Sequence, residues 1–284
     1  MKAPATLAPA AIEAPGVAAA PPQPVTVPRK RTWLGIANRY RLASLVVVLL
    51  IWEVVAHRVN PLFLTGPSAI AEAGVQLTQD GELGKAIVSS LQTLAIGYVI
   101  AAVAGVGLGL VMGWYRRVDW VLDPLINALY ATPNVALIPL IILWFGLGVP
   151  SKIVIVLLAA LFPIIINTYA GVRGINASLV EVAQAYGARG GQLFTKIALP
   201  ASMPYIMTGL RLAVGRAIVG MVVAEMFTRL AGLGGMIATY SGSFATDKVF
   251  VAIIVLSAGG VGLTELLKLL EARISPWVET ARIK

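Results

Sequence analysis

The chain contains no cysteine and only one histidine, His57. Disulfide bonds and thiolate metal sites are therefore excluded, and a single imidazole argues against a metal centre. Charge is also scarce, because Asp, Glu, Lys and Arg make up only 12% of the 284 residues, well below their share in a soluble domain. Acidic and histidine side chains are scattered, so we expect no catalytic cluster, no metal site and no cofactor.

Hydrophobic residues, by contrast, make up 58% of the chain and gather in runs long enough to cross a bilayer. Six spans are predicted, at residues 42–56, 87–114, 125–149, 153–172, 204–227 and 249–267. The second, third and fourth runs contain no charged residue. The sequence therefore predicts an all-α, polytopic membrane protein with six transmembrane helices.

The basic residues indicate how the chain is oriented. With the N-terminus inside, the inner segments 1–41, 115–119, 173–203 and 268–284 hold most of the 22 Lys and Arg residues. The positive-inside rule then places both termini in the cytoplasm of a multi-pass protein of the inner (plasma) membrane. This asymmetry explains the net charge of +9 without a nucleic-acid partner.

The chain is expected to divide into four parts. Residues 1–32 are rich in Ala and Pro and predict a disordered cytoplasmic tail. Residues 33–82 hold the first span and an outer loop, with one short amphipathic helix around 68–79. A transmembrane domain over 83–277 includes a cytoplasmic loop at 173–203, and residues 278–284 form a C-terminal tail.

Glycine and proline mark the inner spans. Gly105, Gly109 and Gly113 share one helical face, which fits either packing inside the subunit or a subunit interface. Pro124, Pro133 and Pro139 in the third span predict kinks, as does Pro163 in the fourth, which also carries Asn167 as a candidate pathway or gate residue. Kinks at membrane depth are tolerated inside a bundle or beside a cavity.

The segment 181–200 is polar and broken by glycine, so it cannot lie in lipid. Ser178 and Glu181 match a capping box, which predicts a helix running to about residue 189. A second short amphipathic helix should follow Gly190 and Gly191 and end at Pro200. Glu181 fits two roles equally well, as a helix cap or as a contact for a partner protein.

The same loop carries a resemblance to a known family. Its signature is E-A-A-x(3)-G-x(9)-I-x-L-P, and the matching residues are Glu181, Ala183, Gly187, Ile197, Leu199 and Pro200, with Val182 replacing the first alanine. This signature marks permease subunits of binding-protein-dependent ABC importers, and the chain resembles them over roughly residues 83–277. Further segments around residues 138–146, 162–173 and 208–225 resemble the nitrate/sulfonate/taurine/bicarbonate branch.

The resemblance implies a type I ABC importer permease fold with a cytoplasmic coupling helix. It implies as partners cytosolic ATPase subunits, a periplasmic solute-binding protein and a second copy of the chain, with the six signature residues serving the ATPase contact. The chain has no G-x-x-x-x-G-K-[ST] motif, so ATP hydrolysis would belong to another polypeptide. One departure is Thr93, where that branch often has arginine.

Two charges lie inside the fifth predicted span, Arg216 and Glu225. They are nine residues apart, on roughly opposite helix faces, so direct pairing is not expected. Arg216 fits either a cationic lining for an oxyanion pathway or a structural pair, and Glu225 fits a gate or a packing partner. The alternative to an importer is a secondary transporter or channel driven by an ion gradient, which would predict inverted repeats and paired mid-membrane charges.

Overall fold

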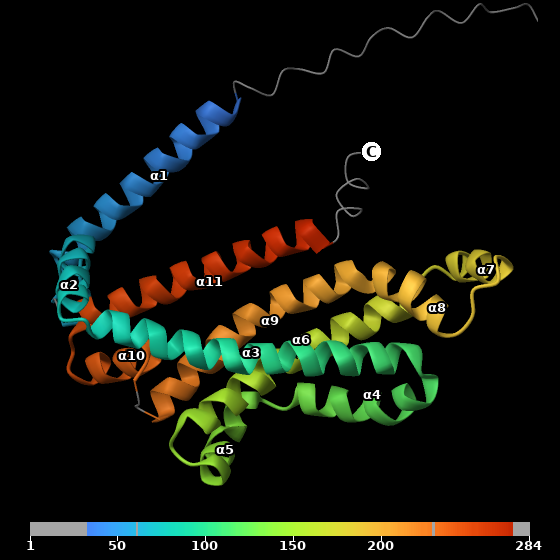
Figure 1. Ribbon diagram of the computed structural model, residues 1–284. Helices are drawn as coiled ribbons and strands as arrows, with labels where there is room; N and C mark the ends of the chain where they lie inside the picture. The colour runs from blue at the N-terminus through green and yellow to red at the C-terminus, as the bar shows by residue number, and fades with distance from the viewer. Residues whose placement is uncertain (1–32, 61, 229–230, 275–284) are drawn as a thin grey trace, which may run out of the picture. The chain divides into compact units, whose positions relative to one another are not determined.

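The computed structural model describes residues 33–60, 62–228 and 231–274. The predicted tails at 1–32 and 278–284 lie outside these residues. The chain divides into two compact units, residues 1–48 and 49–284. Every regular element of the described ranges is helical (Figure 1): α1 (Trp33–Ala56), α2 (Pro67–Gln79), α3 (Glu82–Trp114), α4 (Arg116–Ala131), the 3-10 helix η1 (Asn134–Leu137), α5 (Ile138–Phe145), α6 (Val149–Arg173), α7 (Ala177–Ala185), α8 (Gly191–Leu193), the π-helix η2 (Phe194–Ala198), α9 (Leu199–Thr228), α10 (Leu233–Gly242) and α11 (Thr246–Ile274).

Four helices are long and apolar enough to cross a membrane: α3, α6, α11 and the continuous helix Gly191–Thr228 that contains α9. A fifth span forms if the segments Arg116–Ala131 and Asn134–Phe145, bent by 86°, count as one. The expected count of six is therefore approximate. The apolar run of α1 is short, with Arg39 and Arg41 before it and Glu53 inside it.

The third predicted span is broken rather than kinked. Helix α4 ends at Ala131, and Thr132 adopts an extended conformation (φ −72°, ψ 130°) before Pro133. A residue that precedes proline is driven out of the helical region by the proline ring. Pro139, in contrast, lies in the first turn of α5, where its missing N–H has no cost.

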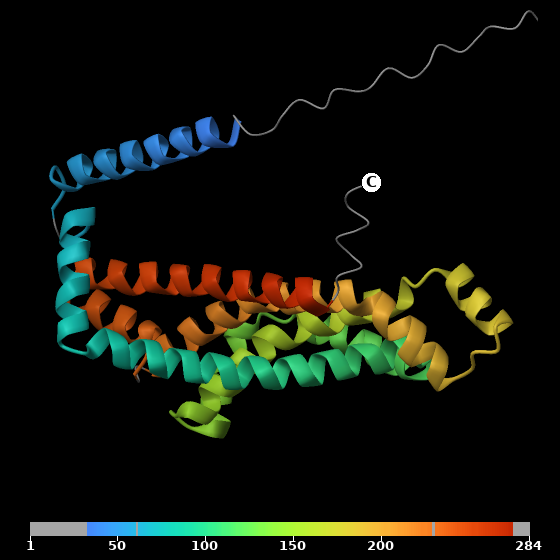
Figure 2. The same cartoon turned by 45° about the horizontal axis from the view of Figure 1, so that its top comes forward.

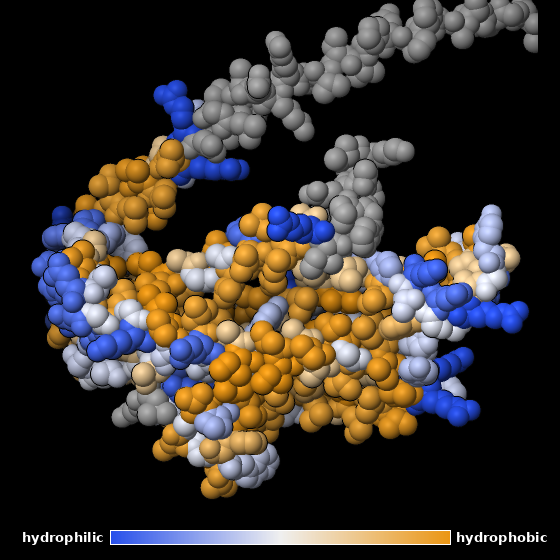
Figure 3. All heavy atoms as spheres, viewed as in Figure 1, coloured by the Kyte–Doolittle hydropathy of each residue, from blue (hydrophilic) through white to orange (hydrophobic). Residues whose placement is uncertain are grey.

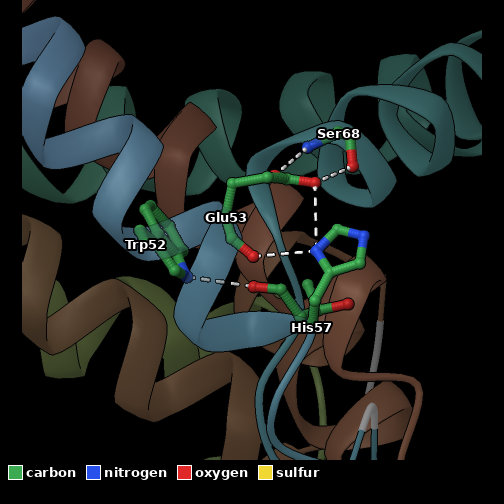
Figure 4. A network of polar contacts seen from close by, with 5 residues as sticks. Trp52, Glu53, His57 and Ser68 are labelled. Atoms are coloured by element: carbon green, nitrogen blue, oxygen red, sulfur yellow. Dashed lines mark hydrogen bonds and ion pairs between the residues drawn. The ribbon is translucent and has the colours of Figure 1, made fainter.

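Helix α2 confirms the predicted helix around 68–79, and its first turn is held by the end of α1 (Figure 4). Its N-cap is Gly66, which has no side chain to accept a hydrogen bond. The Glu53 carboxylate takes over this role by accepting from the backbone N–H (3.1 Å) and the hydroxyl (2.5 Å) of Ser68. Trp52 Nε1 donates to the Thr65 carbonyl (3.0 Å), and His57 Nδ1 donates to the Glu53 carbonyl (2.8 Å). These bonds fix the connection between α1 and α2.

Helices α3 and α6 approach so closely that four glycines are needed between them. A Cβ atom at Gly97, Gly105, Gly109 or Gly113 would lie within 3.0 Å of Val156, Ile164, Thr168 or Val172, respectively. Both sets of residues recur at multiples of four. The glycines of α3 therefore form a shallow groove, and the side chains of α6 pack into it. The glycines at 105, 109 and 113 therefore serve packing inside the subunit.

Helix α6 packs against α9 in the same way, so it lies between two close neighbours (Figure 2). A Cβ atom at Gly209 would come within 2.9 Å of Asn167 Cβ, and one at Gly220 within 2.9 Å of Ala159 Cβ. From the other helix, a Cβ atom at Gly171 would lie 2.6 Å from Tyr205 Cβ. The buried core between α3, α6 and α9 accordingly contains many small residues, among them Ala101, Ala160, Ala213 and Ala217.

The surface of the helical bundle fits a membrane environment. In Figure 3 an apolar zone covers the long helices between two ends where hydrophilic residues gather. Many large apolar side chains are exposed there, including Val103, Val99 and Leu129. The loop between α6 and α9 lies at one end of the bundle, and α2 and α10 lie at the other (Figures 1 and 2).

The glycine groove of α3 gives a first prediction. We expect Gly109→Val to destabilise the protein by about 1 to 3 kcal/mol, because the new side chain would overlap Thr168 and the Ile165 carbonyl. Gly107→Val is the matched control, since nothing lies within 4 Å of a Cβ atom at Gly107 on the same helix. Thermal denaturation of the two purified variants in detergent measures the difference, and equal midpoints would contradict the packing argument.

Candidate functional site

The loop between α6 and α9 begins with a cap that differs from the predicted one. Asn176 is the N-cap of α7, and its side-chain oxygen accepts from the Ser178 N–H (3.0 Å) and hydroxyl (2.9 Å). The predicted capping box of Ser178 and Glu181 is therefore wrong, because α7 starts one residue before Ser178. Glu181 is exposed and has no side-chain hydrogen bond or ion pair to any residue that the structure describes.

Helix α7 also ends earlier than predicted, at Ala185 instead of about residue 189. Gly187 adopts a left-handed conformation (φ +85°), and the Ala188 N–H turns back to the Ala183 carbonyl (2.9 Å). This is the usual way in which a glycine terminates a helix. The left-handed backbone conformation by itself therefore favours glycine at position 187, whether or not a partner protein binds there.

The second half of the loop contains a π-helical turn instead of a separate helix. After α8 and η2 the chain runs straight into α9, and Gly191–Thr228 forms one helix of 38 residues. The Leu199 N–H donates to the carbonyl of Phe194, five residues back. Pro200 has no N–H to contribute, and the wider π turn before it accommodates its ring. The prediction that Pro200 ends a helix is therefore wrong.

The six signature residues divide between three elements. Glu181 and Ala183 lie on α7, Gly187 follows that helix, Ile197 lies in η2, and Leu199 and Pro200 open α9. None of the residues of α7 is buried, and Leu179, Val182 and Tyr186 are 52%, 55% and 90% exposed. A shallow hollow of about 380 Å³ lies beside α7, lined by Gln184, Ala188, Arg189, Gly190 and Leu193. This loop therefore presents apolar side chains that the rest of the bundle leaves uncovered.

A cavity of about 420 Å³ opens beside the break between α4 and α5. Its walls are mainly apolar and include Ile138, Ile155, Phe162 and Val219. Its polar contributors are Tyr130, Thr132, Asn134 and Arg216. Arg216 is exposed and forms no ion pair within the described ranges, so its charge in α9 has no partner there. A cavity of this kind offers an anion a guanidinium group at membrane depth.

Asn167 lies apart from this cavity. Its Nδ2 donates to the Pro163 carbonyl (2.8 Å) one turn earlier on the same helix. Its Cβ faces Gly209 of α9. The structure therefore places Asn167 in the close contact between α6 and α9, and it does not line the cavity that Arg216 lines.

Glu225 is fully buried and holds the start of α10. Its carboxylate accepts from the Ser90 hydroxyl (2.9 Å) and from the Gly234 N–H (2.9 Å). The Ser90 oxygen in turn accepts from the Leu233 N–H (2.8 Å). Lys152, only 2% exposed, donates to the Ala231 carbonyl (3.0 Å) and offsets the carboxylate charge. The site is a buried polar cluster that joins α3, α6 and α9 to the segment before α10.

Sequence reasoning missed the partners of several charges. The hydrogen bond from Ser90 to Glu225 and the pairing of Arg211 with Glu271 of α11 were not predicted. Arg173, at the end of α6, pairs with Asp119 of α4. Thr93, the position of the departure from the branch, is buried and donates to the Ser89 carbonyl (3.1 Å). Each ion pair joins residues more than fifty positions apart, so spacing along the chain carries no signal for it.

The chain is similar to known transport proteins over most of its length. Residues 105–276 match the family described as the binding-protein-dependent transport system inner membrane component. The putative aliphatic sulfonates transport permease protein SsuC of Bacillus subtilis is 36% identical over 81% of this chain and 84% of its own. The taurine transport system permease protein TauC of Escherichia coli is 32% identical over 83% and 88%. The formylaminopyrimidine transport permease protein ThiX of Halalkalibacterium halodurans is 32% identical over 82% and 93%.

The buried cluster around Glu225 gives a second prediction. We expect Glu225→Ala to lower the free energy of unfolding by about 3 kcal/mol or more, because the Ser90 hydroxyl and the Gly234 N–H would lose their buried acceptor and the Lys152 ammonium its nearby opposite charge. Glu225→Gln keeps an acceptor oxygen and should lose less. Glu265→Ala, which removes an exposed pair with Lys268, is the control and should change little. A Glu225→Ala protein as heat-stable in detergent as the control would disprove the anchoring role.

Proposed function

This chain belongs to the family of binding-protein-dependent transport system inner membrane components and is an ABC importer permease, and we propose that it forms the pathway for a small oxyanion. The observation that carries the proposal is Arg216, whose guanidinium lies in the wall of an otherwise mostly apolar cavity and forms no ion pair with the residues that the structure describes. A charge at membrane depth without a local partner is costly, so its presence there indicates a function. An anion passing the cavity would supply the missing partner.

We further propose an aliphatic sulfonate or taurine as the substrate, ahead of nitrate or bicarbonate. SsuC and TauC, two of the similar proteins, are named for sulfonates and taurine. The cavity also suits a molecule with both a charged and an apolar part, because Arg216 stands among isoleucine, valine and phenylalanine side chains. A bare inorganic anion would leave those walls without a contact.

The exposed loop supports the second half of the proposal, which concerns the partners. Glu181, Ala183 and Gly187 would lie against a cytosolic ATPase subunit, while Ile197, Leu199 and Pro200 would connect that contact to α9. Uncovered apolar residues on α7 favour a protein partner over solvent. Two copies of the chain would enclose one pathway, with a periplasmic binding protein at the opposite end of the bundle. This arrangement places the loop and both termini in the cytoplasm, with the transmembrane domain at about 83–277.

ATP hydrolysis belongs to the partner in this proposal, since the sequence has no phosphate-binding loop motif. Membership of the family also removes the support for the ion-gradient alternative. The chain itself would alternate between inward-open and outward-open states as the ATPase subunits close and separate.

The proposal predicts ATP-dependent uptake. Cells that contain the gene should accumulate labelled taurine or an aliphatic sulfonate, and cells without it should not, because the pathway is missing. Depletion of ATP should abolish the difference, whereas collapse of the ion gradient at constant ATP should preserve it. Labelled nitrate serves as the comparison substrate. Uptake that follows the ion gradient and ignores ATP would refute the importer mechanism.

The role of Arg216 predicts a separate effect. Arg216→Ala should reduce uptake about tenfold or more, because the anion loses a charged hydrogen-bond donor. Arg216→Lys keeps the charge and should retain more activity, although it loses the planar fork of the guanidinium. The amount of each variant in the membrane is measured in parallel. Normal uptake by Arg216→Ala would refute the pathway role, and loss of the protein itself would favour a structural role.

A further inference from the structure

An aromatic pair joins the loop between α6 and α9 to the rest of the helical bundle. The rings of Trp114, the last residue of α3, and Phe194, the first residue of η2, lie 5.1 Å apart at an interplanar angle of 70°. This edge-to-face arrangement is the favoured geometry for two aromatic rings. Of the three close aromatic pairs in the described part of the chain, only this one joins the loop to another helix.

On the side of Trp114 the contact is rigid. The preceding residue is Gly113, where a Cβ atom would lie only 2.5 Å from Val172 Cβ. The end of α3 is therefore locked to the end of α6, with backbones in close approach. Arg173, the next residue of α6, is also tied to α4 through Asp119. Trp114 thus projects from the place where three helices are fixed together.

On the side of Phe194 the contact belongs to the long helix that continues into α9. Phe194 opens the π turn, which continues without interruption into α9, the helix that carries Arg216. Helix α7, with no buried residue of its own, packs mainly against α8 and η2. Along the chain, a force applied to α7 therefore reaches α9 through the segment of Phe194. The π turn adds local adaptability at the same point.

We propose that the Trp114–Phe194 pair is a bearing contact, in which Trp114 supports Phe194 so that movement of the loop becomes movement of α9. The inference rests on the proposed function, because it assumes that an ATPase subunit moves this loop. With Phe194 supported by Trp114, displacement of α7 tilts α9 against the fixed ends of α3 and α6. Without that support the loop would move while α9 stays in place. Both residues are positioning residues, since neither needs to contact the solute or ATP.

The test uses the complete complex, reconstituted in proteoliposomes with its ATPase and binding protein. Phe194→Leu and Trp114→Leu preserve an apolar side chain but remove the ring contact. We expect each to lower the amount of solute transported per ATP hydrolysed by roughly fivefold or more, with unchanged copurification of the ATPase. A merely structural contact would lower the yield of complex and leave that ratio unchanged.

Two further variants sharpen the result. The exchanged pair, Trp114→Phe with Phe194→Trp, restores two rings and should recover most of the ratio. Phe250→Leu removes the ring contact with Trp52 (5.5 Å, 58°), which involves neither the loop nor α9, and should leave the ratio at the wild-type value.

Leucine variants that assemble and transport the wild-type amount of solute per ATP would overturn the inference. If they do not copurify with the ATPase, the exchanged pair decides. A recovered ratio supports the bearing contact, and a low ratio in a fully assembled complex overturns it. Failure of the proposed function is distinguishable, because it would appear in the wild-type chain as a complex without ATP-driven transport.

Discussion

The close approach of α6 to both α3 and α9 is the contact on which the remaining structure depends. Glycine stands at the closest approaches of these backbones, and at Gly109 or Gly209 even one added carbon would overlap the neighbouring helix. Inside a bilayer there is little hydrophobic gain from joining two apolar helices, so dense packing has to supply the association. The cavity walls from α6 and α9, including Phe162 and Arg216, are placed by this contact.

The two ends of the bundle differ in how firmly their outer segments are attached to the long helices. At the α10 end, the buried Glu225, Ser90 and Lys152 hold the segment before α10 through a cluster in which each charge has a partner. At the other end, Val182 of α7 and Tyr186 just after it are exposed, and α7 packs mainly against α8 and η2. A firmly bonded end resists displacement, whereas a loosely attached loop is suited to being moved by a partner. This contrast supports an importer in which force enters at the loop.

Local sequence rules failed at three places for identifiable reasons. Ser178 matched a capping box, yet Asn176 caps α7 by accepting from the Ser178 N–H, so that Ser178 lies inside the first turn and is not the N-cap. Pro200 suggested a helix end, yet a π turn lets the helix continue past it. Pro133 suggested a kink, yet the backbone before it opens into an extended residue and the span breaks. The two prolines were correctly identified as disturbances of a helix, but their outcome depended on their neighbours.

The sequence by itself determined the membrane class, the long helices, the helix α2 and the signature loop, because run length, periodicity and spacing are local properties that survive in any fold. Only the tertiary structure decided which charges have partners. It joined Glu225 to Ser90 across 135 positions and Arg211 to Glu271, and it left Arg216 beside a cavity. Only it brought Phe194 to the ring of Trp114. Such contacts depend on how helices distant in the chain pack together, and hydrophobicity and spacing carry no record of that arrangement.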